Sequence, residues 1–266
     1  MRVDRRCGAP GQVHDDVAFK DRGSPVPSRN LLLRSLGPAV EDLGLHLSLV
    51  SFKAGQVIKH ECEANDLVYF PIQGLISSRM AFRSGHEIEC SLIGKTNALG
   101  ALSALGLHHG STHFLCLTDG QAWTMTLSHL VAAVRTQPMV ERQIKLFAFA
   151  QMGYAVRVGV CNAMHTAEQR LARWLATAAE LLGQCEIRLA QEELSSSLGL
   201  QRSCVSPALQ KLKAEGMVDV ARGRIFILDP DRLSRRACEC GPMLRRALGL
   251  DDGFDGTAAM GSFGQR

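Results

Sequence analysis

The fold is decided by residues 189–228, whose sequence is LAQEELSSSLGLQRSCVSPALQKLKAEGMVDVARGRIFIL. This stretch predicts one helix over about Gln191–Leu198 and a second over about Arg202–Glu215, each closed by a glycine. Gly199 and Gly216 suit these ends because glycine adopts a positive φ at little cost. Two short helices joined by such a tight turn are typical of a helix-turn-helix.

The second helix has two chemically different faces. Val205, Leu209 and Leu212 follow the i, i+4, i+7 spacing of a helix with one buried face. The opposite face carries side chains that suit contacts with phosphates and base edges. We expect the DNA contacts of this helix to come from Gln201, Arg202, Ser203, Ser206, Gln210, Lys211 and Lys213.

A small hairpin follows the second helix. Val218–Val220 and Ile225–Leu228 predict two strands, and Arg222-Gly223-Arg224 gives a basic tip between them. A helix-turn-helix followed by such a wing is typical of DNA-binding proteins. We expect Arg222 and Arg224 to act mainly on phosphates.

The basic residues are concentrated beside this motif. The net charge of the whole chain is only +4, but between Gln201 and Arg246 ten Lys and Arg residues accompany five Asp and Glu residues. A solvated surface would explain this excess by itself. Its position beside the helix-turn-helix favours contact with double-stranded DNA.

Length and composition set the broad class. With 266 residues, 46% of them hydrophobic, the chain can form one to three domains with a substantial core. No apolar run approaches the roughly 18 residues of a membrane span, and the first residues lack the apolar core of a secretory signal. The nine scattered cysteines suit a reducing compartment. We therefore expect a cytoplasmic protein without a membrane partner.

Toward the N-terminus, the sequence changes from unpatterned to strand-rich. Residues 1–28 mix charges, Gly and Pro without a period, so we expect a disordered arm. A leucine-rich amphipathic segment follows over Asn30–Leu49. From there to Thr126, short apolar runs alternate with turn residues, which predicts an antiparallel barrel or sandwich. The predicted strands are Val57–Lys59, Leu67–Phe70, Leu75–Phe82, Glu87–Leu92, Phe114–Leu117 and Gln121–Thr126.

Beyond Ser128 the periodicity becomes helical. Pro138 fits the first turn of a long helix, where its missing N–H costs least. We predict a dimer seam formed by Val140, Ile144, Phe147, Gln151, Tyr154 and Val158. The alternative is that this face packs on the β domain of the same chain. Thr166–Gln169 then matches a capping box for a helix over Ala167–Leu182, which makes Asn162–His165 the expected hinge.

Three segments occur in a recognisable order. They are FKAGQVIKHECEANDLVYFPIQGLIS (Phe52–Ser77), CNAMHTAEQRLARWL (Cys161–Leu175) and RGRIFILD (Arg222–Asp229). Together they resemble the Crp/Fnr superfamily of bacterial transcription regulators, over about Asn30–Cys240. The sequence ACEC (Ala237–Cys240) looks like the end of the wing domain in an effector-orphan branch of that superfamily.

The resemblance implies an α+β fold with a cyclic-nucleotide-binding-like β-roll, a long dimerisation helix and a winged helix-turn-helix. It also implies a homodimer on a near-palindromic operator, with a signal at the β-roll or dimer helix that reorients the DNA-binding heads. RNA polymerase would be a further partner of an activator. The expected layout is a disordered arm (1–28), a β-roll sensor (29–136), a dimerisation helix and hinge (137–164), a winged helix-turn-helix (165–240) and a flexible tail (241–266).

The stretch that would hold a nucleotide departs from the family pattern. Relatives that bind cyclic AMP use a Gly-Glu pair for the ribose and an Arg followed by a small residue for the phosphate. Gly94–Leu117 contains no Glu and no Arg, and Lys95 is its one formal charge. A bound phosphate would lack a charge-assisted hydrogen bond, each worth about 1.5–3 kcal/mol. We therefore predict that cyclic AMP is not the effector.

The cysteines and histidines do not form a recognisable cofactor motif in the sequence. Oxygen-sensing relatives hold an iron–sulfur cluster with closely spaced cysteines, whereas Cys7, Cys62, Cys90 and Cys116 are dispersed. The pair Cys238-Glu239-Cys240 lacks the further ligands of a structural zinc site. The histidines of the 94–117 stretch are interpreted as loop residues: His108, His109 and His113. We predict no cofactor and no metal.

The recognition helix also departs from the family pattern. Where relatives often carry a second Arg one turn after the first, this chain has Pro207, which cannot contact a base and removes a backbone donor. Proline is tolerable there if the helix begins near Ser203. Base contacts would then fall mainly on Arg202. Ala190 replaces the Ser or Thr expected to cap the first helix, a loss of roughly 0.5–2 kcal/mol.

The residues favour a sequence-specific, DNA-binding transcription regulator. A module that senses a ligand or binds a partner, and whose degenerate helix-turn-helix no longer contacts DNA, is the alternative that Pro207 and Ala190 leave open. An enzyme is disfavoured because the sequence has no nucleophile elbow, P-loop, dinucleotide fingerprint or zinc-hydrolase helix.

Overall fold

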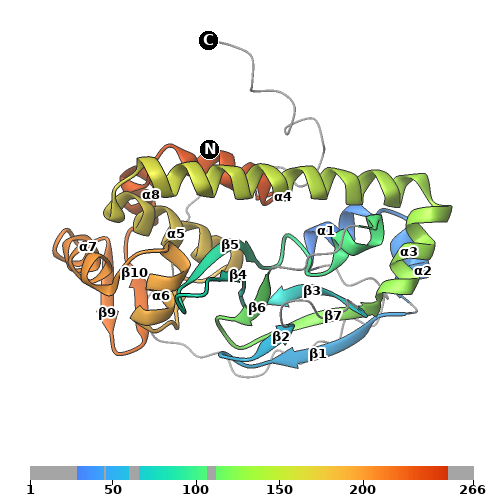
Figure 1. The fold of residues 1–266 in the computed structure, drawn as a ribbon, viewed down its shortest axis with the longest axis horizontal. Coiled ribbons are helices and arrows are strands. Elements are labelled where there is room, and N and C mark those ends of the chain that lie inside the picture. Colours follow the sequence, from blue (N-terminus) through green and yellow to red (C-terminus); the bar gives the residue numbers. More distant parts are fainter. Residues whose placement is uncertain (1–28, 45, 60–65, 107–111, 251–266) are drawn as a thin grey trace, which may run out of the picture.

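The computed structural model describes residues 29–44, 46–59, 66–106 and 112–250 (Figure 1). The arm expected over residues 1–28 lies outside the described residues, as do His108 and His109. The described chain forms a β-rich part and a helical part, and one long helix runs along both (Figure 1). This is the α+β architecture that the sequence predicts.

The β-rich part consists of two antiparallel sheets. Strands β1 (Ser48–Phe52), β7 (Gly120–Thr126) and β3 (Leu67–Gln73) form one sheet, in that order. The other has the order β2-β6-β4-β5, with strands Val57–Lys59, His113–Cys116, Ile76–Ala81 and Glu87–Ile93. Each predicted strand is present with bounds shifted by a few residues at most, whereas β1 was not predicted.

The two sheets enclose an apolar core to which alternate residues of their strands contribute. Phe52, Ile76 and Phe114 are buried in it. The turn after β3 brings Gly74, at φ +88°, so close to β7 that a Cβ would lie 2.7 Å from the Asp119 carbonyl oxygen. Glycine is therefore required at this turn for both its conformation and its size.

Short helices close one end of the β-rich part. They are α1 (Leu31–Ser35), α2 (Ala39–Gly44), the 3-10 turn η1 (Ala101–Leu105) and α3 (Leu127–Thr136). Asn30 anchors α1: its side chain accepts a hydrogen bond from the Leu33 N–H and donates to the Pro71 and Asn97 carbonyls. The leucine-rich segment thus covers this end of the β-rich part, as the sequence predicts.

The long helix α4 (Pro138–Met164) has 27 residues and begins at the predicted proline. It runs from the helical cap of the β-rich part to the C-terminal helices (Figure 1). By length and composition alone it could cross a membrane. The helix remains regular to Met164, so the break between α4 and α5 consists of His165 and Thr166 rather than Asn162–His165, and a hinge there stays a prediction.

The C-terminal part is built on α5 (Ala167–Leu182). Its N-terminus has the predicted capping box, in which Thr166 and Gln169 exchange hydrogen bonds. The remaining elements are β8 (Glu186–Ile187), α6 (Gln191–Leu198), α7 (Arg202–Ala214), β9 (Val218–Ala221), β10 (Arg224–Ile227), α8 (Pro230–Arg236) and α9 (Cys240–Ala247). Strands β8, β10 and β9 form a small antiparallel sheet in that order.

The expected flexible tail from residue 241 is wrong for its first part. Residues Cys240–Ala247 form α9, which packs on α4. Leu244 and Leu248 have no exposed surface because they join the core of the C-terminal part. The spacing of Cys240, Leu244 and Leu248 at i, i+4 and i+8 is the helical signal that the sequence prediction overlooked. Residues 251–266 lie outside the described residues.

Candidate nucleic-acid interface

The helix-turn-helix consists of α6 and α7, joined as predicted at Gly199, which has φ +57°. Ala190 occupies the N-cap of α6 and gives no side-chain hydrogen bond, so the expected loss of a cap is confirmed. On α7 the predicted apolar side chains Val205, Leu209 and Leu212 are buried. They fix the helix on the core and leave its other face toward solvent.

The first turn of α7 is the most accessible part of the predicted recognition face. Gln201, Arg202 and Ser203 are exposed there. The helix begins at Arg202, so Pro207 lies beyond the first turn, and its missing N–H removes the bond to the Ser203 carbonyl. The chain nevertheless continues as a helix to Ala214, with Pro207 exposed.

Several of the predicted DNA-contacting side chains already have polar partners. Lys211 Nζ lies 2.8 Å from a Glu168 carboxylate oxygen, and Lys213 Nζ lies 2.9 Å from Asp219 Oδ1. The hydrogen bond from Lys213 holds the pKa of the Asp219 carboxyl below its usual value. The Lys213–Asp219 pair is exposed on both sides, so it is weak and can yield to a phosphate. Glu168, the partner of Lys211, is only 17% exposed and also pairs with Arg236.

The other polar residues of α7 and the wing differ in whether they have a hydrogen-bond or ion-pair partner. Ser206 Oγ donates to Gln191 Oε1 at 3.2 Å, whereas Gln210 is exposed. At the wing, Arg224 lies 3.8 Å from Glu186. Among the described residues, Arg202 and Arg222 pair with no acidic side chain.

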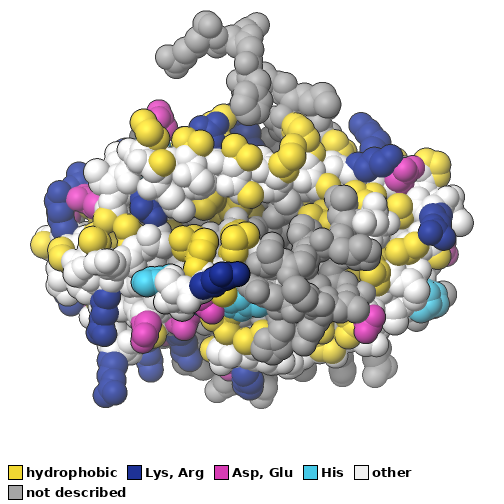
Figure 2. Space-filling model, in the orientation of Figure 1, with side chains coloured by type: hydrophobic (Ala, Val, Ile, Leu, Met, Phe, Trp, Pro, Cys, Tyr) yellow, Lys and Arg dark blue, Asp and Glu magenta, His cyan; other side chains and the backbone are white. Residues whose placement is uncertain are grey.

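The wing is an exposed β-turn between β9 and β10. Gly223 has φ +70°, and its carbonyl accepts a hydrogen bond from the Leu189 N–H at 3.1 Å, which ties the turn to the start of the helix-turn-helix. Figure 2 shows Lys and Arg side chains at the end of the molecule where α7 and the β9–β10 hairpin lie in Figure 1. One end of the molecule therefore combines an exposed helix N-terminus with a basic hairpin.

The predicted dimer seam is wrong in its choice of helix face. Val140, Ile144, Phe147 and Tyr154 are buried by other parts of the same chain, so their side chains cannot meet a partner. Gln151 and Val158 are half-buried, and Gln151 accepts a hydrogen bond from Ser91 Oγ. The alternative, that this face packs on the chain's own β domain, holds for most of the set.

The opposite face of α4 carries an exposed apolar stripe. Figure 2 shows hydrophobic side chains along the edge that α4 occupies in Figure 1. Met152, Val156 and Met164 are 58%, 64% and 74% exposed. The stripe consists of Phe149, Met152, Val156, Val160 and Met164, at spacings of three and four. The sequence contained this signal, but the larger hydrophobes on the buried face obscured it.

A buried polar network joins the β-rich part to the helix-turn-helix. Arg79 of β4 is 2% exposed, and its Nη2 lies 2.8 Å from Glu193 Oε2 on α6. Beside it, Glu89 of β5 accepts hydrogen bonds from Trp174 Nε1 at 2.9 Å and Ser77 Oγ at 2.8 Å. Burial raises the pKa of the Glu89 carboxyl, although these hydrogen bonds and Arg79 oppose the shift. Sequence reasoning did not find this network because its members are far apart in the chain.

The segment Gly94–Leu117, which would hold a nucleotide in cyclic-AMP-binding relatives, has little positive charge among its described residues. Burial lowers the pKa of Lys95. The Nζ atom of Lys95 lies close to Gly183, the C-cap of α5: a Cβ atom added to this glycine would be 3.1 Å from the Nζ atom. The lysine thus lies beside the carbonyl end of a helix, which favours a cation. His113 lies 3.4 Å from Glu87. Cys90 and Cys116 stand apart from the cysteines near the C-terminus.

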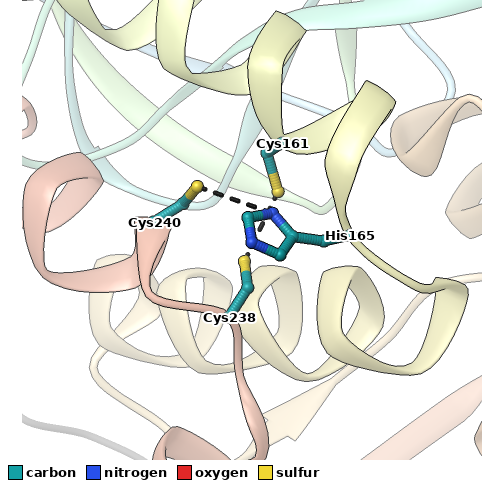
Figure 3. Close-up of side chains that lie close together, drawn as sticks. All are labelled: Cys161, His165, Cys238 and Cys240. Atoms are coloured by element: carbon teal, nitrogen blue, oxygen red, sulfur yellow. Dashed lines mark hydrogen bonds between the residues drawn. The ribbon is translucent and has the colours of Figure 1, made fainter.

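Four potential metal ligands lie together at the junction of α4 and α9. Cys161, His165, Cys238 and Cys240 place one ligand atom each within 4.8 Å of one another (Figure 3). The thiols of Cys161 and Cys238 share a hydrogen bond, which lowers the pKa of Cys161 to about 5. The prediction that Cys238 and Cys240 lack further ligands is therefore wrong, because the fold supplies two from the end of α4.

Comparison with known proteins places these features in context. Residues 169–236 match the Crp-like helix-turn-helix domain. A CRP-like cAMP-activated global transcriptional regulator of Mycobacterium tuberculosis is 25% identical over 207 residues, which cover 75% of this chain and 92% of that protein.

Solved structures show the same fold. FixK2 from Bradyrhizobium japonicum has a TM-score of 0.62 at 18% identity and covers 72% of this chain and 98% of its own. A transcriptional regulator of the CRP/FNR family from Thermus thermophilus has a TM-score of 0.56 at 20% identity. The match covers 71% of this chain and 98% of that protein. At these identities the structures establish the fold alone.

Proposed function

Because this chain belongs to the Crp/Fnr family of DNA-binding transcription regulators, we propose that it binds a near-palindromic operator sequence-specifically as a homodimer. The observation that carries the proposal is the end of the molecule formed by α7 and the wing. There Arg202 is exposed on a helix anchored by buried leucines, and Arg222 is exposed on the wing.

In the proposed complex, α7 enters the major groove by its N-terminal turn. Arg202 would hydrogen-bond a guanine edge through its two-pronged guanidinium, while Gln201 and Ser203 contact adjacent bases or phosphates. Arg222 and Arg224 on the wing would neutralise phosphates. Pro207 leaves base recognition to the start of the helix, so the operator differs from those of relatives with a second arginine.

The homodimer is proposed to form along the exposed stripe of α4. A second copy would bury Met152, Val156 and Met164 against the same residues of its partner, as in a two-stranded helical seam. The two-fold axis would then place two α7 helices in successive major grooves, about 34–36 Å apart. A stripe this apolar is unfavourable in water unless a partner covers it.

We further propose that a signal other than cyclic AMP acts on the β-roll, in a cytoplasmic protein that contacts RNA polymerase if it is an activator. The mycobacterial relative is cAMP-activated by its name, but the described part of Gly94–Leu117 offers a phosphate no Arg. The Arg79–Glu193 contact would carry the signal, since it joins the β-roll to the helix that positions α7.

The decisive experiment is selection of bound sequences from a random DNA pool by the full chain. We expect an inverted repeat whose half-site centres lie about 10 base pairs apart. Enrichment of a single half-site would overturn the dimeric arrangement. If no sequence is enriched, with or without metabolite extract, the alternative of a degenerate helix-turn-helix that binds a partner protein is supported instead.

A further inference from the structure

We propose that Cys161, His165, Cys238 and Cys240 form a structural zinc site that fastens the DNA-binding part to the end of α4. The binding of the metal does not depend on the proposed function. The effect of the metal on DNA binding does rest on the proposed function.

The distances fit a single tetrahedral ion. The thiol sulfurs of Cys161 and Cys238 lie 3.4 Å apart, and the Cys240 sulfur lies 3.8 Å from His165 Nδ1 (Figure 3). Zinc with Zn–S bonds of about 2.3 Å and Zn–N bonds of about 2.0–2.1 Å separates its ligand atoms by roughly 3.5–4 Å. All four atoms lie within 4.8 Å of one another, so small side-chain rotations suffice to close the site.

The four ligands come from rigid or capped positions. Cys161 lies in the last turn of α4, and His165 is its C-cap, so the i, i+4 spacing puts both on one side of the helix end. Cys238 follows α8, and Cys240 is the first residue of α9. The packing of α9 on α4 brings the two pairs together.

The chemical character of the ligand set selects the metal. Three thiolates and one imidazole are the donors that zinc prefers, and four protein ligands leave no open position for catalysis. The cysteines are buried, and the His165 side chain is 15% exposed, so the site is closed to solvent exchange. Binding would release the protons of the thiols that are not yet ionised.

Charge balance gives an independent argument. Arg170 and Arg173 are both buried close to the thiols of Cys161 and Cys238, and Arg173 also lies close to Glu89. Arg170 donates hydrogen bonds to the Asn162 and Leu198 carbonyls. The Nε atoms of both arginines have no hydrogen-bond partner in the described part of the chain. Buried guanidinium groups require nearby negative charge. A zinc ion with three thiolates carries one net negative charge, which these arginines would offset.

The outer surroundings of the histidine also fit. His165 Nδ1 faces the sulfur of Cys240, and Nε2 lies 3.7 Å from a Glu239 carboxylate oxygen on the solvent side. A carboxylate behind the second ring nitrogen fixes the tautomer and strengthens the other nitrogen as a ligand. The sequence Cys-Glu-Cys thus supplies two ligands and the carboxylate between them.

The test uses the full chain, purified under reducing conditions, with Zn²⁺ and Co²⁺ as probes and no DNA. We expect one zinc per chain after isolation. Titration of the metal-free protein with Co²⁺ should give thiolate charge-transfer bands and the intense visible bands of a tetrahedral ion. Failure to bind Co²⁺ at millimolar concentration would overturn the proposal, as would an iron–sulfur spectrum or a Cys161–Cys238 disulfide in the isolated protein.

Variants locate the site. Cys240→Ser should weaken Co²⁺ binding more than about 100-fold, because loss of an outer partner alone costs about 10–100-fold. Cys90→Ser, which removes a half-buried thiol outside the cluster, should bind as the wild type does. Equal affinities for both variants would overturn the assignment. If Cys240→Ser does not fold, the cobalt spectrum of the wild type still counts the thiolate ligands.

The consequence for the DNA-binding part is measured separately. Zn²⁺ should raise the melting temperature of the wild type but not of Cys240→Ser, because the ion links two packed helices. A protein that binds zinc but selects no DNA sequence would refute the proposed function and leave the metal site intact. A protein that selects DNA without binding metal would refute the site alone.

Discussion

In the proposed complex, Arg202 and Arg222 are the residues on which DNA recognition would depend most directly. Both are exposed, and within the described ranges neither pairs with a carboxylate, so neither arginine has to leave an ion pair before it contacts DNA. The two differ in their support. Arg202 begins a helix with a buried face, whereas Arg222 lies on a turn. A base contact needs the rigid support, while a phosphate contact does not.

Replacement of Arg202 by Ala should weaken binding to the selected operator by about 1–3 kcal/mol and relax specificity at one base position. Fluorescence anisotropy with the operator and its single-base variants measures both effects. Arg135→Ala, at the far end of the molecule on α3, is the matched control and should change neither. Equal losses on specific and random DNA would make Arg202 a phosphate contact only.

Replacement of Arg222 by Ala should reduce the slope of log affinity against log salt concentration by about one, because one fewer phosphate is neutralised. Sequence preference should be unchanged. Binding measured at a series of salt concentrations gives the slope. An unaltered slope would remove the wing tip from the interface.

At the scale of elements, α4 has two apolar faces with different tasks. One face buries Ile144, Phe147 and Tyr154 in the chain's own core. The other leaves Met152 and Val156 in solvent. A helix that is apolar nearly all round requires partners on both sides, which explains why composition alone also fits a membrane span.

Substitution of Val156 by Glu should dissociate the proposed dimer, because two carboxylates would be buried opposite each other across the two-fold axis. The folded monomer should persist, since Val156 is 64% exposed. Sedimentation velocity measures the mass, and circular dichroism checks the fold. Arg135→Glu introduces the same side chain outside α4 and should remain dimeric. A dimer in the Val156→Glu variant would show that the seam lies elsewhere.

At the scale of the whole molecule, the β-roll and the helix-turn-helix meet through buried polar groups. The buried Glu89 is held by Ser77 and Trp174 and faces Arg79, which in turn reaches Glu193 on α6. Partly buried polar contacts of this kind depend on geometry, so under the proposed function a movement of the sheet would be passed to α6, on which α7 packs.

The raised pKa of Glu89 predicts a pH dependence of stability. Burial raises the pKa above its ordinary value of 4.5, so the folded state holds the proton more tightly than the unfolded state. The stabilisation by neutral Glu89 is complete below pH 4.5 and is lost as pH rises through the folded pKa.

Glu89→Gln should remove this contribution, which is measured as the difference in unfolding free energy between wild type and variant from pH 4 upward. The wild type should lose stability relative to the variant as pH rises. Glu41→Gln, at an exposed position on α2, should give a curve parallel to that of the wild type. A constant difference for Glu89→Gln would contradict the prediction.

The sequence by itself determined the features that depend on neighbouring residues. The helices of the helix-turn-helix, the strand at Val57–Lys59 and the capping box at Thr166 follow from periodicity, turn glycines and side chains three residues apart. These features can be predicted without the rest of the chain, because the interactions that produce them span only one or two turns.

The tertiary structure alone decided which residues meet across long separations. Cys161 and Cys238 are 77 positions apart, and Glu89 and Trp174 are 85 apart. The face of α4 that is buried, and the helix that replaces the expected tail, were likewise set by packing. No local pattern encodes these contacts, because they arise only when separate elements bury their apolar faces against one another.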